Sequence, residues 1–85
     1  MNNFVLIGNC VGYMPPIDVI KVKVGEDVFI ADITTLKEKG DCHKEFQRRV
    51  AKQSKIAVYG KIMLNQSNTI WLKVERIVDI KGDDE

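Results

Sequence analysis

The chain has 85 residues, enough for one small domain, and 45% of them are hydrophobic and 29% charged. This composition is typical of a globular protein and excludes wholesale disorder, but a domain of this length buries only about 60–65% of its unfolded surface, so a partner subunit would help. No apolar run approaches the roughly 20 residues that span a bilayer, and the first residues lack the basic flank and apolar core of a signal peptide, so we expect a cytoplasmic protein.

The first predicted element is a strand over about residues 2–10. Its run Phe4–Ile7 is apolar on both faces, as in a strand that is covered on two sides or that contacts another subunit. Gly8 indicates a bend or bulge, which a strongly coiled small barrel requires. Met14-Pro15-Pro16 ends this part of the sheet, because proline has no backbone N–H to donate to a ladder.

Two further strands are expected over about residues 17–24 and 27–35. Gly25-Glu26 joins them as a two-residue turn of the II′ kind, with glycine first. If Val24 pairs with Asp27 across this turn, alternation decides which side chains share a face. Ile20 then faces Ala31 and Val22 faces Phe29 in the core, whereas Lys21 faces Ile30 and Lys23 faces Val28 on a half-exposed outer surface.

A helix is predicted over about residues 41–53. Asp41 is a suitable N-cap, because its carboxylate can accept the free backbone N–H groups of the first turn. Cys42, Phe46 and Val50 recur every four residues and indicate the buried stripe. The rest of the helix surface is basic, so we expect it to cover one end of a barrel with these residues in solvent: Lys44, Arg48, Arg49 and Lys52.

The last predicted element is a hairpin over residues 55–80, with its polar turn at Asn65–Asn68. Both strands alternate, and the residues expected to face the core are Ile56, Val58, Ile62, Leu72, Val74 and Val78. The opposite face carries Tyr59 and Lys61 on the first strand and Trp71 and Lys73 on the second. A ring for base stacking beside a cation for phosphate suits a single-stranded nucleic acid, but the same rings would also suit an oligomer interface.

The net charge of +1 hides an uneven distribution. Residues 37–61 carry eight basic and three acidic side chains, a local charge of +5, while the remainder of the chain is at −4 and ends in Asp83-Asp84-Glu85. A basic segment next to outward aromatic rings favours nucleic-acid binding more than either feature alone.

Enzymatic and metal-binding functions find little support. Cys10 and Cys42 are widely separated, and His43 is the only histidine, so neither a C-x-x-C metal motif nor a nucleophile–base set is present. Asp18, Asp27 and Asp32 are spread over two predicted strands without metal-ligand spacing. We therefore expect no catalytic activity, no metal and no cofactor.

The element order is strand-strand-strand-helix-strand-strand. Five strands with a helix between the third and the fourth predict an all-β protein with one helix, the OB-fold, a five-stranded Greek-key barrel that commonly binds oligonucleotides. The domain is expected over residues 1–81, followed by a short acidic end at 82–85.

Several segments suggest a family. The opening Asn3-Phe-Val-Leu-Ile-Gly-Asn9 resembles the first strand of bacterial single-stranded DNA-binding proteins, and Lys52-Gln-Ser-Lys-Ile-Ala-Val-Tyr-Gly-Lys-Ile62 resembles their helix end and fourth strand. Ile70–Ile80 is similar to their fifth strand, and the chain resembles the smaller primosomal replication proteins equally well. The resemblance implies sequence-tolerant binding of single-stranded DNA in replication, recombination or repair, and assembly into a homo-oligomer, a dimer or a tetramer.

The expected contacts follow from these parts. Trp71 and Tyr59, with Tyr13 as a weaker candidate, would stack on bases. Phosphates would be neutralised by Lys21, Lys23, Lys61, Lys73, Arg48 and Arg49. RNA is an alternative to DNA. The alternative function is an OB-fold protein-interaction module that contacts replication or helicase-loading proteins and binds DNA weakly or not at all, which the scarcity of aromatic residues on the second and third strands favours.

Overall fold

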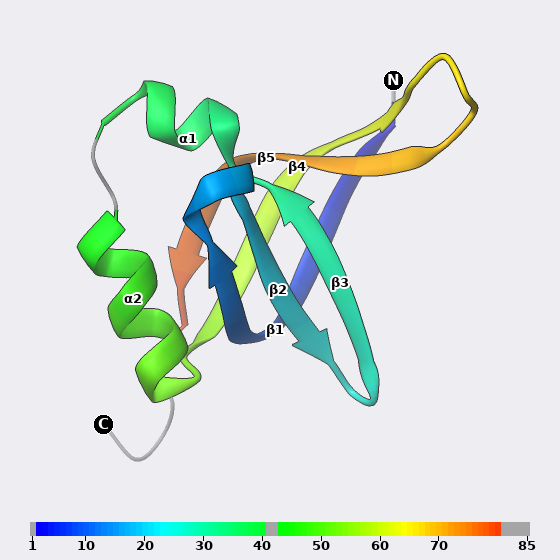
Figure 1. Cartoon of the computed structure of the whole chain (residues 1–85). Coiled ribbons are helices and arrows are strands. Elements are labelled where there is room, and N and C mark those ends of the chain that lie inside the picture. The colour runs from blue at the N-terminus through cyan, green and yellow to red at the C-terminus, as the bar shows by residue number, and fades with distance from the viewer. Residues whose placement is uncertain (1, 41–42, 81–85) are drawn as a thin grey trace.

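The computed structural model of the protein describes residues 2–40 and 43–80. Its strands are β1 (Asn3–Met14), β2 (Val19–Val24), β3 (Asp27–Asp32), β4 (Lys55–Leu64) and β5 (Ile70–Asp79). They close into one barrel in the order β1-β2-β3-β5-β4, with only the β3–β5 pair parallel (Figure 1). The prediction of a five-stranded barrel of the OB-fold type is confirmed. Three predictions concern residues outside the described part of the chain: the helix cap at Asp41, the burial of Cys42 and the acidic end at 82–85.

Two helices connect β3 to β4 and lie on one side of the barrel, whereas the two hairpin turns project on the other (Figure 1). The helix α2 (His43–Lys52) matches the predicted helix, but α1 (Thr34–Glu38) is not predicted. The chain leaves the strand early because the carboxylate of Asp32 accepts a 2.7 Å hydrogen bond from the backbone N–H of Thr34, which starts the first helical turn. Neither of these helices is long and apolar enough to cross a membrane.

The hairpin of β2 and β3 has the predicted register. Val24 pairs with Asp27 across the turn, so that Ile20 lies opposite Ala31 and Lys21 opposite Ile30. Gly25 has a φ of 63°, as a Gly-first turn requires. The two prolines end β1 as expected, since they form a short 3₁₀ helix at Pro15–Ile17.

The strand β1 belongs to two pairs of strands. Residues Asn3–Asn9 pair with β4, and Asn9–Met14 pair with β2. The bulge expected at Gly8 is instead between Cys10 and Gly12. Gly8 itself lies against the backbone of Lys23, and a Cβ atom there would overlap the Lys23 carbonyl oxygen. The glycine therefore permits a close crossing of β1 and β2.

A bulge in the hairpin of β4 and β5 changes which side chains face the core. Tyr59 pairs with Arg76 and Gly60 with Val74, so β5 has one residue more than β4 between these pairs. The prediction that Val78 faces the core is consequently wrong. Val78 is 41% exposed, and Ile77 packs against the core in its place.

The turn of this hairpin is held by one side chain. The Asn65 side-chain oxygen accepts hydrogen bonds from the backbone N–H groups of Ser67, at 2.9 Å, and Thr69, at 3.0 Å. Asn68 adopts a left-handed conformation with φ 61°, which asparagine tolerates better than most residues. The hairpin thus ends in a short, internally bonded turn.

The core lies inside the barrel and beneath α2. Phe46 of the helix is fully buried and covers one end of the barrel, and each buried aliphatic or aromatic side chain contributes about 1.5–3 kcal/mol. The residues of this cluster are Cys10, Ile20, Val22, Ala31, Ile33, Phe46, Ile56, Val58 and Val74.

Candidate nucleic-acid interface

A groove of about 500 Å³ opens between β3 and the hairpin of β4 and β5. It exists because β3 pairs with β5 only through its last two residues, Ala31 with Leu72 and Asp32 with Lys73, so that the first four residues of β3 have no partner on β5. Every side chain that lines the groove is apolar: Phe4, Leu6, Val28, Phe29, Ile30, Ile62, Ile70, Trp71 and Leu72. Such a lining offers few side-chain hydrogen bonds to distinguish one base from another, the Trp71 indole N–H being one donor, but it offers surfaces on which any base can stack.

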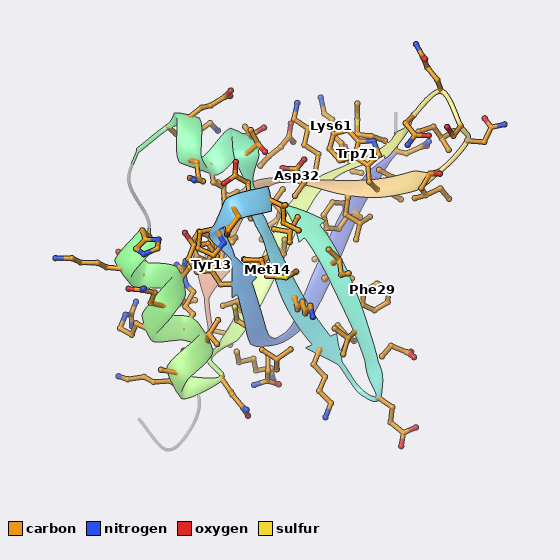
Figure 2. The ribbon with its side chains drawn as sticks, in the orientation of Figure 1. Tyr13, Met14, Phe29, Asp32, Lys61 and Trp71 are labelled. Atoms are coloured by element: carbon orange, nitrogen blue, oxygen red, sulfur yellow. The ribbon has the colours of Figure 1, made fainter. Side chains whose placement is uncertain are left out.

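Two aromatic rings form opposite sides of this groove. Trp71 lies half-buried on β5 beside Met63 of β4, and Phe29 on β3 is 37% exposed. Figure 2 shows Trp71 on the hairpin of β4 and β5 and Phe29 on β3. Phe29 was predicted to be a core residue. It has the predicted partner Val22, but it precedes the two residues of β3 that pair with β5 and is therefore only partly covered.

The other two residues predicted to stack on bases, Tyr59 and Tyr13, lie outside the groove. The ring of Tyr59 is covered by the Arg76 guanidinium, 4.3 Å from its centroid. The Tyr13 ring stacks on Phe46 at 5.3 Å, and its hydroxyl lies 2.8 Å from Nδ1 of His43, so this residue joins β1 to α2. The structure therefore leaves Trp71 as the one predicted stacking residue that lines the groove.

None of the predicted lysines lines the groove, but two of them lie next to residues that do. Lys21 and Lys23 lie on the outer face of β2, directly opposite the groove residues Ile30 and Val28. Their side of the sheet is the half-exposed outer surface expected from the hairpin register.

The other two lysines lie on the hairpin of β4 and β5. Lys61 and Lys73 are cross-strand partners, and Lys61 makes a 3.8 Å ion pair with Glu75. Because Lys73 and Trp71 are two residues apart on β5, they share its outer face. Lys61 and Lys73 thus lie on the same hairpin as the groove residue Trp71, and Lys21 and Lys23 lie across from groove residues of β3.

Arg49 is not at this surface, and the expectation that it faces solvent is wrong. Only 7% of the residue is exposed, and its Nε and Nη2 atoms donate to the two carboxylate oxygens of Asp79 at 2.9 and 3.0 Å. The hydrogen bond to Asp79 raises the pKa of Arg49, and the same bond lowers the pKa of Asp79. The guanidinium also lies 5.1 Å from the centre of the Phe46 ring. It ties α2 to β5 and is not free for a phosphate.

Arg48 is exposed as expected, but it lies on the side of the barrel away from the hairpin turns. Its guanidinium is 3.8 Å from the Glu45 carboxylate, and its side chain is 51% exposed on α2. The helix lies on the side of the barrel away from the hairpin turns (Figure 1). A strand in the groove would not reach it without bending around the domain.

A second apolar surface lies on the outer face of β1, β4 and β5. One row across these strands consists of Val5, Tyr59 and Arg76, and the next consists of Ile7, Ala57 and Val78. Val5 and Ile7 are 55% and 52% exposed. This surface, which we call the β1 face, contains no residue of the groove.

No site for a metal ion is found in the described part of the chain, in which no three histidine, cysteine, aspartate or glutamate residues cluster. Cys10 is buried, and this burial raises the pKa of its thiol, which keeps it neutral and poorly reactive.

Several groove residues were missed by sequence reasoning, above all Phe4, Phe29 and Ile70. Phe4 and Phe29 have the alternation of core residues, and Ile70 begins β5 next to the turn. Phe4 and Ile70 lie at the start of their strands, where a small barrel is least well closed, but Phe29 lies within β3 and its sequence position gives no such signal.

Comparisons of the chain with protein-family models, with curated proteins and with solved structures find no match. The function therefore has to be argued from the groove and its surroundings.

Proposed function

We propose that the protein binds single-stranded nucleic acid, and single-stranded DNA in particular, with little sequence preference. One observation carries the proposal: a groove lined by aliphatic and aromatic side chains, Trp71 and Phe29 among them, has Lys21 and Lys23 next to its β3 residues and Lys61 and Lys73 on the same hairpin as Trp71. The groove suits unpaired bases, and the lysines suit the phosphates on either side of them. A duplex hides the faces of its bases and should bind more weakly.

Binding is measured by fluorescence anisotropy of labelled oligo-dT at low and high salt. Trp71→Ala should weaken binding by about 5- to 150-fold, which corresponds to about 1–3 kcal/mol for one stacked base. Trp71→Phe retains a ring and should keep most of the affinity. Gln47→Ala, at an exposed position on α2 away from both the groove and the β1 face, is the location control and should bind nearly as the wild type does. If wild type gives no signal at low salt, or Trp71→Ala binds as wild type does, the proposal is wrong.

The proposal includes a homo-oligomer formed through the β1 face. Val5 and Ile7 are more than half exposed there, and a small domain gains stability when such a surface is covered. Light scattering should give the mass of a dimer or a tetramer for the wild type and a lower mass for Ile7→Glu. An unchanged mass for this variant would mean that the β1 face is not the contact.

A protein-interaction module for replication or helicase-loading proteins is the second candidate, and the aliphatic and aromatic lining of the groove favours it. An apolar segment of a partner would occupy the groove as readily as bases do. Absence of oligo-dT binding at low salt would favour this function over the first.

A further inference from the structure

Two lysines of the proposed interface stand directly opposite one another. Lys61 of β4 and Lys73 of β5 are cross-strand partners, a position in which Cβ atoms lie about 5 Å apart. Like charges at such a position repel each other. An anion between the two ammonium groups removes this repulsion and bonds to both.

The bulge in β5 places a carboxylate beside one of these lysines. Glu75 is the extra residue between the pairs Tyr59–Arg76 and Gly60–Val74, so it has no cross-strand partner of its own. Its Oε2 atom lies 3.8 Å from Nζ of Lys61, with 42% and 43% of the two side chains exposed. This separation is too long for a hydrogen bond, so the contact is weak and easily exchanged.

Lys73 has a different acidic neighbour. In the parallel pairing of β3 with β5 it lies opposite Asp32. One carboxylate oxygen of Asp32 already accepts the backbone N–H of Thr34 at 2.7 Å, which holds that side chain at the start of α1. No ion pair joins Lys73 to a described residue, so Glu75 is the acidic group that competes within this lysine pair.

We propose that Lys61 and Lys73 together hold one phosphate of the bound strand, and that Glu75 is an internal competitor which this phosphate displaces from Lys61. The proposal rests on the proposed function, since it concerns the same strand. Trp71 and Lys73 share one face of β5 about 6.6 Å apart along the strand, so a base on the Trp71 ring has its backbone near the lysine pair. Figure 2 shows Lys61 and Trp71 on the same stretch of the hairpin.

As a consequence, the contact between Glu75 and Lys61 lowers the affinity of the protein for the nucleic acid. Each binding event must break the contact between Glu75 and Lys61 before the phosphate gains both lysines. Removing the carboxylate should therefore tighten binding without adding any contact to the nucleic acid, and the gain should require Lys61.

The test is a double-mutant cycle on oligo-dT binding, with wild type, Glu75→Gln, Lys61→Met and the double variant. Glu75→Gln should tighten binding about two- to fivefold at low salt, the range expected for loss of an exposed ion pair. Lys61→Met should weaken binding and reduce the slope of log affinity against log salt by about 0.7. In the Lys61→Met background, Glu75→Gln should give no gain.

Glu38→Gln is the matched control, because it makes the same change in net charge at an exposed position on α1. The inference is overturned if Glu75→Gln binds no more tightly than Glu38→Gln, or if its gain persists without Lys61. These outcomes differ from failure of the proposed function, in which wild type itself does not bind oligo-dT at low salt and this inference fails with it. Because Glu75 is exposed and has no buried contact to lose, thermal melting should show all of its variants folded.

Discussion

The ion pair that joins α2 to β5 offers the sharpest prediction about stability. Arg49 is 7% exposed, whereas the side chain of Asp79 is 45% exposed. Loss of one partner should therefore not cost the same stability as loss of the other. Loss of Asp79 leaves a buried guanidinium whose remaining acidic contact is Glu45 at 3.4 Å, while loss of Arg49 leaves a carboxylate that water can reach.

Asp79→Asn should lower the free energy of unfolding by about 2 kcal/mol. Breaking a fully buried pair costs about 3–5 kcal/mol, and we discount this value because Asp79 is almost half exposed and Glu45 remains. In a domain of this size, 2 kcal/mol corresponds to a fall in Tm of about 8–16 °C. Arg49→Met keeps an apolar side chain against Phe46 and removes the buried charge, so it should cost less than about 1 kcal/mol.

Urea denaturation followed by circular dichroism measures both variants. Because Arg49 lowers the pKa of Asp79, the pair stabilises the fold above the unfolded pKa of about 4, and this contribution is lost as the pH falls through the lower folded value. Wild type should therefore lose its advantage over Asp79→Asn in acid. Equal costs for the two variants at pH 7, or a cost below about 0.5 kcal/mol for Asp79→Asn, would refute this account of the pair.

Two further predictions concern a glycine and the basic helix. Gly60→Ala should destabilise the fold by about 2–3 kcal/mol in the same urea experiment, because the new Cβ would overlap a backbone carbonyl of β5. Gly12→Ala should cost less, since its Cβ would meet only the flexible side chain of Lys21; equal costs would contradict this view. On an oligo-dT of about eight nucleotides, Arg48→Glu should bind as wild type does, whereas Lys21→Glu should bind several-fold more weakly. A loss with Arg48→Glu as large as that with Lys21→Glu would place the strand on α2 instead of the groove.

The parts of the fold that depend on neighbouring residues could be predicted from the sequence. The register of β2 and β3 follows from Gly25-Glu26 alone, because a two-residue turn decides every pair in its hairpin. The barrel follows from the order of the elements. These inferences need no knowledge of distant contacts.

The wrong predictions concern residues whose burial depends on contacts with distant parts of the chain. Alternation assigned Val78 to the core, but the bulge opposite Gly60 exchanges its role with that of Ile77. Spacing by four along α2 assigned Arg49 to solvent, although it lies three residues after Phe46 and so borders the buried stripe. Its partner Asp79 is 30 residues away, and no local pattern connects the two.

In the candidate interface, too, the features set by neighbouring residues were predicted, and those set by distant contacts were not. The outward lysines were predicted from alternation, and so was Trp71. The groove beside Trp71 was not, because it exists only where the first part of β3 has no partner on β5. Phe29 illustrates the difference: its cross-strand partner was predicted correctly, yet its exposure depends on a strand more than 40 residues further along the chain.

The internally bonded turn at Asn65 bears on how quickly a strand could be exchanged. Since this turn is already ordered by its own side chain, the hairpin loses little conformational entropy when a ligand arrives. Association then needs no slow folding of an arm over the strand, and dissociation needs no unfolding of one. If the protein binds single-stranded DNA as proposed, a short oligonucleotide should bind and dissociate in a single kinetic step, so that the complex would be rapidly reversible.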